Sequence, residues 1–130
     1  MPSQIYISSR DPKTSGNGPL AGIRMLIKDN IHLKGIKTSA GSLEFYNANG
    51  PQKKTAECVQ ILIDKGAAIL GKTKMAPFWK WEESGAYGDY EAPLNPRADP
   101  KKSRRGKIPG CAAAITSYDC IDAVISTDSM

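Results

Sequence analysis

The sequence predicts an α/β fold, and three consecutive segments support this prediction. The apolar run Ile23–Ile27, which ends at Lys28, is typical of a buried strand. Residues 55–65 repeat apolar side chains at helical spacing, and residues 67–71 form a second short apolar run. A strand, an amphipathic helix and a second strand make a βαβ unit, whose two strands run parallel. We therefore expect Lys28 and Lys72 to lie at the same edge of the sheet, where open α/β sheets bind their ligands.

The segments before this unit indicate a short arm followed by one domain. Residues 1–17 are expected to form an N-terminal arm, in which Ile5–Ile7 can pair as an edge strand. The domain is expected over residues 18–130 and opens with a loop that contains Gly18 and Gly22.

A second loop is expected over residues 31–43, with Gly35 and Gly41 as hinges. The small polar run Thr38–Ser42 lies in this loop. Small side chains there would let a ligand or another strand approach closely.

The clearest helix is predicted over Thr55–Lys65. Thr55 is a good N-cap residue, and Gly66 supplies the stop after Lys65. The apolar face is formed by the residues that recur at helical spacing, which are Val59, Leu62 and Ile63.

The second half of the chain predicts a long loop, a helix and a strand. Residues 72–98 hold five aromatic side chains separated by Gly and Pro, which favours packing anchors in a loop over a substrate cage. Residues 111–115 are small and are expected to begin a helix that packs tightly on the sheet. Residues 122–126 are expected to form a last apolar strand.

The composition narrows the class of protein. A chain of 130 residues is long enough for one modest domain. Its three cysteines form no Cys-x-x-Cys pair, and its single histidine, His32, leaves no cluster for a metal. No apolar window reaches the length of a membrane span, so we expect a soluble, cytoplasmic protein without membrane contact.

The net charge of +5 comes from one short run. Residues 101–107 hold five basic side chains and no acidic one, and the rest of the chain balances at 13 basic against 13 acidic residues. Such runs bind nucleic acid or direct nuclear import in some proteins. Because no aromatic side chains are interleaved for base stacking, the run favours a solvated loop over a nucleic-acid site.

Lys28 is the candidate for chemistry that the residues alone suggest. A lysine that closes a buried strand either reaches water along its aliphatic stem or loses much of its charge, since burial disfavours the ammonium form. A lysine held neutral at a strand end would be a base. Both interpretations remain open at this point.

A set of motifs along nearly the whole chain resembles the amidase signature family, the Ser-cisSer-Lys hydrolases. It is closest to the fungal amidase-like proteins of pigment and secondary-metabolite clusters. The motifs are Gly18-Pro-Leu-Ala-Gly-Ile, Ile27-Lys-Asp-Asn, Lys37-Thr-Ser-Ala-Gly, Ala68-Ile-Leu-Gly-Lys-Thr-Lys-Met, Asn95-Pro-Arg-Ala-Asp, Ala112-Ala-Ala and Ser126-Thr-Asp.

The resemblance implies an N-terminal, incomplete part of a larger α/β/α fold with a mixed sheet flanked by helices. It also implies hydrolysis of amide C–N bonds, a small-molecule amide as substrate, and no cofactor or metal. In this family a serine attacks the amide carbonyl, and a second serine relays the proton to a neutral lysine.

Carried over by position, only one member of this triad is present. Lys28 matches the lysine base. The relay serine falls on Lys107, and the nucleophile falls about three residues beyond Ser129, so the chain reads as truncated or degenerate. Cys111 is a weaker substitute nucleophile, because it matches a small packing residue of the family.

Three hypotheses follow. The chain is a silent amidase-family protein that keeps Lys28 as a vestigial base, or an enzyme whose serines come from another chain. Alternatively it binds a ligand through the vestigial cleft or the basic loop 101–107. An incomplete sheet leaves apolar edges that a protein partner would cover.

Overall fold

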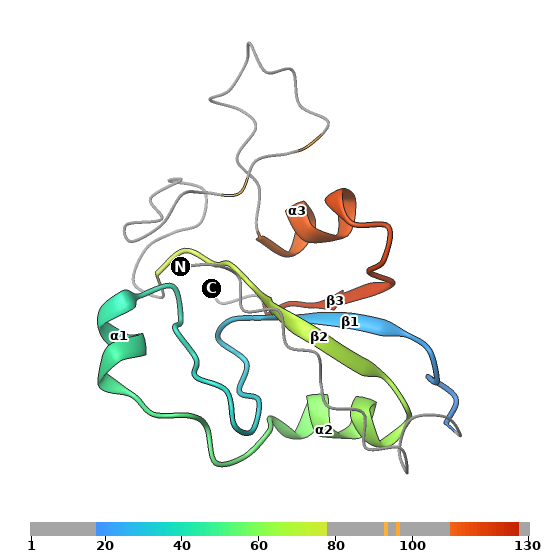
Figure 1. The fold of residues 1–130 in the computed structure, drawn as a ribbon, viewed down its shortest axis with the longest axis horizontal. Helices are drawn as coiled ribbons and strands as arrows, with labels where there is room; N and C mark the ends of the chain where they lie inside the picture. The colour runs from blue at the N-terminus through green and yellow to red at the C-terminus, as the bar shows by residue number, and fades with distance from the viewer. Residues whose placement is uncertain (1–17, 78–92, 94–95, 97–109, 128–130) are drawn as a thin grey trace.

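The computed structural model describes residues 18–77, 93, 96 and 110–127, and a parallel sheet lies at the centre of this part of the chain (Figure 1). The elements in order are β1 (Arg24–Lys28), α1 (Leu43–Ala48), α2 (Glu57–Asp64), β2 (Ala68–Thr73), α3 (Gly110–Ser117) and β3 (Ala123–Ile125). The three strands lie in the order β2–β1–β3, and both pairings are parallel. The predicted α/β class and the parallel βαβ unit are therefore confirmed.

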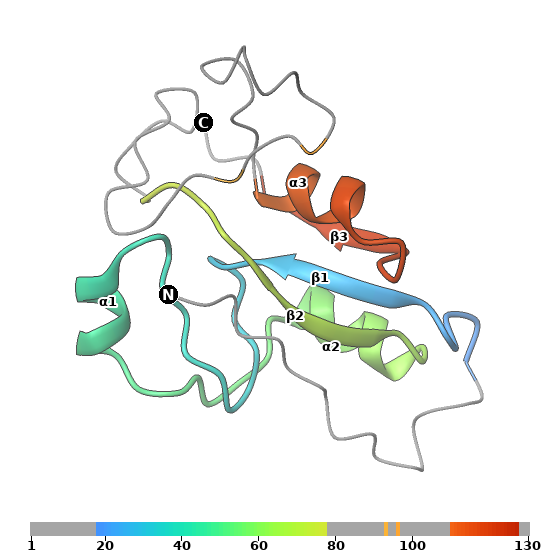
Figure 2. The ribbon, with the colours of Figure 1, turned by 45° about the horizontal axis from the view of Figure 1, so that its top comes forward.

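The apolar core lies between the sheet and α2. Met25 and Ile27 alternate with less buried residues along β1, as expected for a strand with one face on a core. They form one buried cluster with Val59 of α2 and Ile69 of β2. Helix α3 lies on the opposite face of the sheet from α2 (Figure 2). The described part of the chain thus has a helix on each side of a three-stranded sheet.

Helix α2 begins later than predicted. Its N-cap is Ala56, which has no side-chain capping bond, so the prediction of Thr55 as the cap is wrong. The hydroxyl of Thr55 instead accepts a hydrogen bond from the Lys34 backbone N–H at 3.1 Å, and the Ala56 N–H donates to the His32 carbonyl. The Thr55 hydroxyl is therefore bound to the loop after β1 and does not cap α2.

The end of α2 follows the prediction. Gly66 has φ of +100° and donates its N–H to the Ile63 carbonyl, while the Ala67 N–H donates to the Leu62 carbonyl. This pair of bonds is a Schellman motif, which favours glycine because of its positive φ. The backbone of Gly18 lies directly against Lys65, where an added Cβ would fall 2.0 Å from the carbonyl oxygen. The opening glycine loop of the domain is thus a packing contact on the end of α2.

Helix α1 was not predicted, because its first residue, Leu43, was placed at the end of a loop. Ser42 caps this helix with a side-chain oxygen that accepts from the Phe45 N–H at 3.2 Å. The helix has six residues and none of them is buried, so it carries no apolar stripe that a sequence pattern would reveal.

A β-bulge in β2 decides which way its last residues face. Met25 pairs with Ile69, but Leu26 pairs with Gly71, so Leu70 is an extra residue on β2. The bulge places Lys72 opposite Ile27 and Thr73 opposite Lys28. Because side chains alternate along a strand, Lys72 shares the face of Ile27, and Lys28 lies on the other face. The two lysines lie at the same edge, as predicted, but on opposite faces of the sheet.

The remaining strand and helix predictions differ only in their bounds. Strand β2 extends to Thr73 instead of ending at Gly71, α3 covers the predicted helix, and β3 lies within the predicted last strand and is one residue shorter at each end. Several predictions lie outside the described residues, namely the arm 1–17 with Ile5–Ile7, the aromatic loop from Phe78, the basic loop 101–107, Lys107 and Ser129.

Candidate functional site at the carboxyl edge of the sheet

Lys28 lies at the last position of β1 and is 5% exposed. Its Nζ donates a hydrogen bond to the backbone carbonyl of Thr127, two residues after β3, at 3.0 Å. The side chain therefore stays at the sheet edge and does not extend into solvent. The interpretation in which the aliphatic stem carries the amine out to water therefore does not describe this lysine.

Asn30 lies beside Lys28 and contacts the same residue. Its Nδ2 donates to the Thr127 hydroxyl at 2.6 Å, so Lys28 and Asn30 together fix the segment that follows β3. The Oδ1 atom of Asn30 is buried and has no hydrogen-bond partner among the described residues. Buried acceptors of this kind are normally paired. This amide is consequently a candidate contact for a ligand that carries an N–H or O–H donor.

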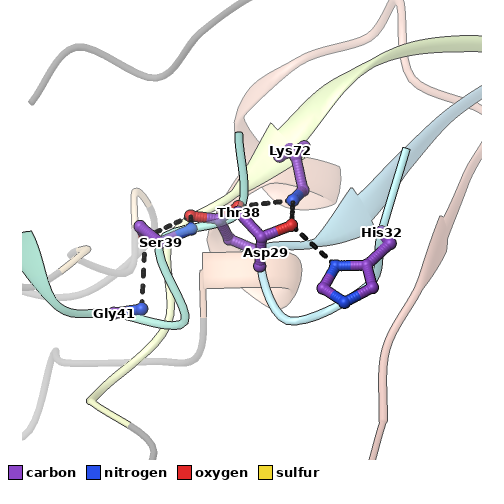
Figure 3. A network of polar contacts seen from close by, with 6 residues as sticks. All are labelled: Asp29, His32, Thr38, Ser39, Gly41 and Lys72. Carbon is purple, nitrogen blue, oxygen red and sulfur yellow. Dashed lines mark hydrogen bonds and ion pairs between the residues drawn. The ribbon is translucent and has the colours of Figure 1, made fainter. Parts of the chain in front are cut away.

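Lys72, on the other face, belongs to a buried polar network (Figure 3). Its Nζ lies 2.7 Å from Asp29 Oδ1 and donates to the Thr38 hydroxyl at 3.0 Å. Burial lowers the pKa of the Lys72 ammonium, and the neighbouring Asp29 carboxylate opposes that shift. The lysine thus sits in an ion pair that partly compensates for its desolvation.

The same network fixes the loop after β1. Asp29 Oδ2 accepts hydrogen bonds from both the backbone N–H and the hydroxyl of Ser39. The Ser39 hydroxyl oxygen in turn accepts from the Gly41 N–H at 3.1 Å, and the imidazole of His32 contacts the Thr38 hydroxyl at 2.9 Å. Figure 3 shows Lys72 pointing from β2 toward Asp29 and Thr38, with Ser39 and Gly41 to one side and His32 to the other.

The small residues of the loop 38–42 permit a close contact with the segment after β2. Gly41 has φ of +78°, and an added Cβ would fall 2.5 Å from the carbonyl oxygen of Ala76. The run was expected to admit a ligand or another strand, and the structure instead brings the irregular segment after β2 against it. The sequence did not indicate that the two hydroxyl side chains, Thr38 and Ser39, bind the Asp29–Lys72 pair.

Cys111 lies at the start of α3 and contacts the neighbouring strand. Its Sγ is 2.9 Å from the hydroxyl of Thr73, on the face of the sheet that carries Lys28. Helix α3 packs closely here, since a Cβ on Gly110 would fall 2.1 Å from the Lys74 carbonyl oxygen. The thiol is half-buried and hydrogen-bonded, as expected for a packing residue.

The described residues contain neither a candidate metal site nor a candidate membrane-spanning helix. No three His, Cys, Asp or Glu side chains among them come together in a group that could hold a metal ion. In the same part of the chain, no helix has the length and apolar character of a transmembrane span.

Comparison with known proteins assigns the family. A family model described as "Amidase" matches residues 6–117, which is most of the chain. The chain therefore belongs to the amidase family, and its parallel sheet with flanking helices is a part of the α/β fold of that family.

Individual relatives give the same result. The chain is 34% identical over 126 residues to a glutamyl-tRNA(Gln) amidotransferase subunit from Methanospirillum hungatei, a match that covers 95% of this chain and 28% of that protein. It is 38% identical over 109 residues to the protein of the same name from Nostoc punctiforme, covering 82% and 21%. The chain thus spans less than a third of the length of these curated relatives. No solved structure matched the chain.

Proposed function

We propose that Lys28 is the base of an amide-hydrolysing site of the amidase type. The observation that supports this most directly is the place of the lysine. It is 5% exposed, at the carboxyl end of a parallel strand, with its amine held by the Thr127 carbonyl. Membership of the amidase family supplies the reaction class, which is acyl transfer from an amide.

The chemistry requires a lysine in this setting. A serine hydroxyl attacks an amide carbonyl only when its proton is removed, and a neutral amine in a buried site accepts that proton through a relay. Lys107 stands at the relay position and has no hydroxyl, and the position that matches the nucleophile lies beyond residue 130. The 130-residue chain by itself is consequently expected to be inactive toward amides.

The alternative is that a partner completes the site or that the cleft binds a ligand without turnover. The curated relatives are named as subunits, which favours a partner over a solitary chain. Apolar side chains that are exposed in the described residues also suit a protein contact; they are Leu43, Ile61, Ile115 and Tyr118.

The test examines Lys28 in a chimeric protein made with the Methanospirillum relative. Residues 18–77 of this chain replace the matching segment of the Methanospirillum relative, and amidotransferase activity is measured for the chimera, for Lys28→Met and for Lys53→Met. Lys53 is an exposed lysine of the same segment, so it is a matched control. We expect Lys28→Met to lower kcat by about 100-fold or more, the typical contribution of a general base. Lys53→Met should have no effect.

Two results would count against the proposal. Activity in the Lys28→Met chimera equal to that of the parent chimera would remove the assignment of Lys28 as the base. Release of ammonia from primary amides by the isolated 130-residue chain would show that these residues hydrolyse amides without a serine at the relay position.

A further inference from the structure

Asp29, the residue that follows Lys28, makes polar contacts through its backbone N–H, its backbone carbonyl and its carboxylate. Its backbone N–H donates to the Thr73 carbonyl at 3.2 Å, and its carbonyl accepts from the Ala40 N–H at 3.2 Å. Its carboxylate binds Lys72 through one oxygen and Ser39 through the other. One residue thus connects the end of β1 to β2 and to the loop 38–42.

This residue also lies inside the turn that carries Lys28. The Ile31 N–H donates to the Lys28 carbonyl at 2.9 Å, which closes a β-turn with Asp29 and Asn30 at its centre. Any movement of Asp29 therefore moves the backbone of Lys28. The Lys28 side chain leaves from the opposite face and reaches Thr127, so the backbone of the turn connects it to the ion pair.

A buried ion pair contributes little net stability to a turn. Desolvation of the two charges offsets much of their attraction, and apolar side chains of similar volume often stabilise a protein as well or better. An apolar pair, however, would not bind the Ser39 N–H and hydroxyl or direct the Asp29 backbone. The arrangement of charges and hydroxyls specifies one geometry of the turn.

We infer that Asp29, Lys72 and Ser39 form a positioning cluster that fixes the turn bearing Lys28 and so sets the place of its amine at the sheet edge. The inference rests on the proposed function of Lys28 for its catalytic meaning. The cluster is structural in its contacts, but its effect is specific to one amine. The inference therefore predicts a change at the Lys28 amine that a general change in the stability of the fold would not produce.

The experiment measures acylation of individual lysines in the full 130-residue chain. The chain reacts with an N-hydroxysuccinimide ester of acetate, and peptide mass spectrometry gives the rate at each lysine. Hydrogen exchange of the Ile27 and Ile69 amides, in the paired strands, reports opening of the whole sheet. The variants are Lys72→Met, which removes the ion pair, and Ser39→Ala, which removes the hydroxyl contacts to Asp29 and to the Gly41 N–H.

We expect acylation of Lys28 to rise about tenfold in Lys72→Met, the factor that corresponds to the loss of one charge-assisted hydrogen bond. Ser39→Ala should raise it several-fold. The exposed Lys34 and Lys53 should keep their rates in both variants, and amide exchange of Ile27 and Ile69 should not change. Ser39→Ala keeps both charges, so it provides the test if Lys72→Met does not fold.

Two outcomes would overturn the inference. One is an unchanged rate at Lys28 in either folded variant. The other is a rise at Lys28 that only parallels faster exchange at Ile27 and Ile69, since that would be ordinary loss of stability. Failure of the proposed function is separate, because it would appear in the Lys28→Met chimera and would leave these labelling rates as predicted.

Discussion

Two lysines end neighbouring parallel strands of this chain, and their surroundings differ. Lys72 binds a carboxylate and a hydroxyl in a buried network with Asp29 and Thr38. Lys28 donates to the neutral carbonyl of Thr127 on the other face of the sheet. The difference originates in a single extra residue, Leu70, whose bulge reverses the facing of the strand after it.

The comparison extends from the lysines to the two sides of β1. On the β2 side the segments are joined through the buried residues Ser39, Gly41 and Lys72, which surround the largely buried carboxylate of Asp29. On the β3 side Lys28 is the buried contact, and the other two contacts are exposed: Arg24 binds Asp122 through Nε at 2.9 Å, and Asn30 binds Thr127. We therefore predict that the β2 side is the rigid support, and that the exposed contacts Arg24–Asp122 and Asn30–Thr127 on the β3 side are the ones that salt and pH can weaken.

The largest loss of stability is expected from Gly41→Ala, which adds a methyl group on the β2 side. Gly41→Ala would place a Cβ 2.5 Å from the Ala76 carbonyl oxygen at a φ of +78°. Gly35 has nearly the same φ, +81°, with nothing within 4 Å of an added Cβ, so Gly35→Ala isolates the cost of the backbone conformation. We expect Gly35→Ala to lower the free energy of unfolding by about 1–2 kcal/mol. Gly41→Ala should lower it by at least about 3 kcal/mol, because the clash is with backbone.

Urea unfolding followed by circular dichroism measures both values. Equal losses in Gly41→Ala and Gly35→Ala would show that the contact between the loop 38–42 and the segment after β2 is not tight. The β2 side would then not be a rigid support.

A smaller difference is expected between the two carboxylates that flank β1. Asp29→Asn leaves the Lys72 ammonium, 5% exposed at its side chain, without a counter-ion, and breaking a buried pair costs about 3 kcal/mol. Asp122→Asn weakens a contact that is 33% exposed at the carboxylate, so its effect should be smaller. The two also differ in salt dependence, since ions screen exposed pairs more than buried ones.

The measurement is urea unfolding of the wild type and both variants at low and high salt. The difference between wild type and Asp122→Asn should shrink at high salt, while the difference for Asp29→Asn should persist. A salt-sensitive Asp29 contribution would place that pair with the surface contacts and would contradict the comparison.

Much of the fold follows from the sequence, for local reasons. Apolar spacing identified β1, α2 and β2, and the parallel arrangement followed from the βαβ order. The strand-end position of Lys28 and the stop at Gly66 also follow from neighbouring residues alone. These features depend on interactions over a few residues, which a sequence pattern records directly.

The rest depends on contacts between distant segments. Thr55 has the chemistry of a cap, but a loop before it claims its hydroxyl, so propensity at one position did not decide the start of α2. The bulge at Leu70 leaves no mark in an apolar run of strand length. The pairing of Asp29 with Lys72 was not predicted for the same reason, because the register that the bulge creates brings the two charges to one face.

The smallest expected effect concerns pH on the exposed side. Hydrogen bonds from the Arg24 side chain and backbone lower the pKa of the Asp122 carboxyl from its ordinary value of 3.8 to about 2. Between these two values the unfolded chain binds more protons at Asp122 than the folded chain does, so stability falls as the pH falls through this window. The contribution of this group is fully present above about pH 4 and is lost toward pH 2.

Other carboxylates also titrate there, which makes the difference between the wild type and Asp122→Asn the quantity of interest. Urea unfolding at pH 5, 4, 3 and 2 should show the two proteins converging as the pH is lowered. If the gap between them stays constant, the Arg24–Asp122 pair does not hold β1 to β3, and the bonds of Lys28 and Asn30 to Thr127 must do so instead.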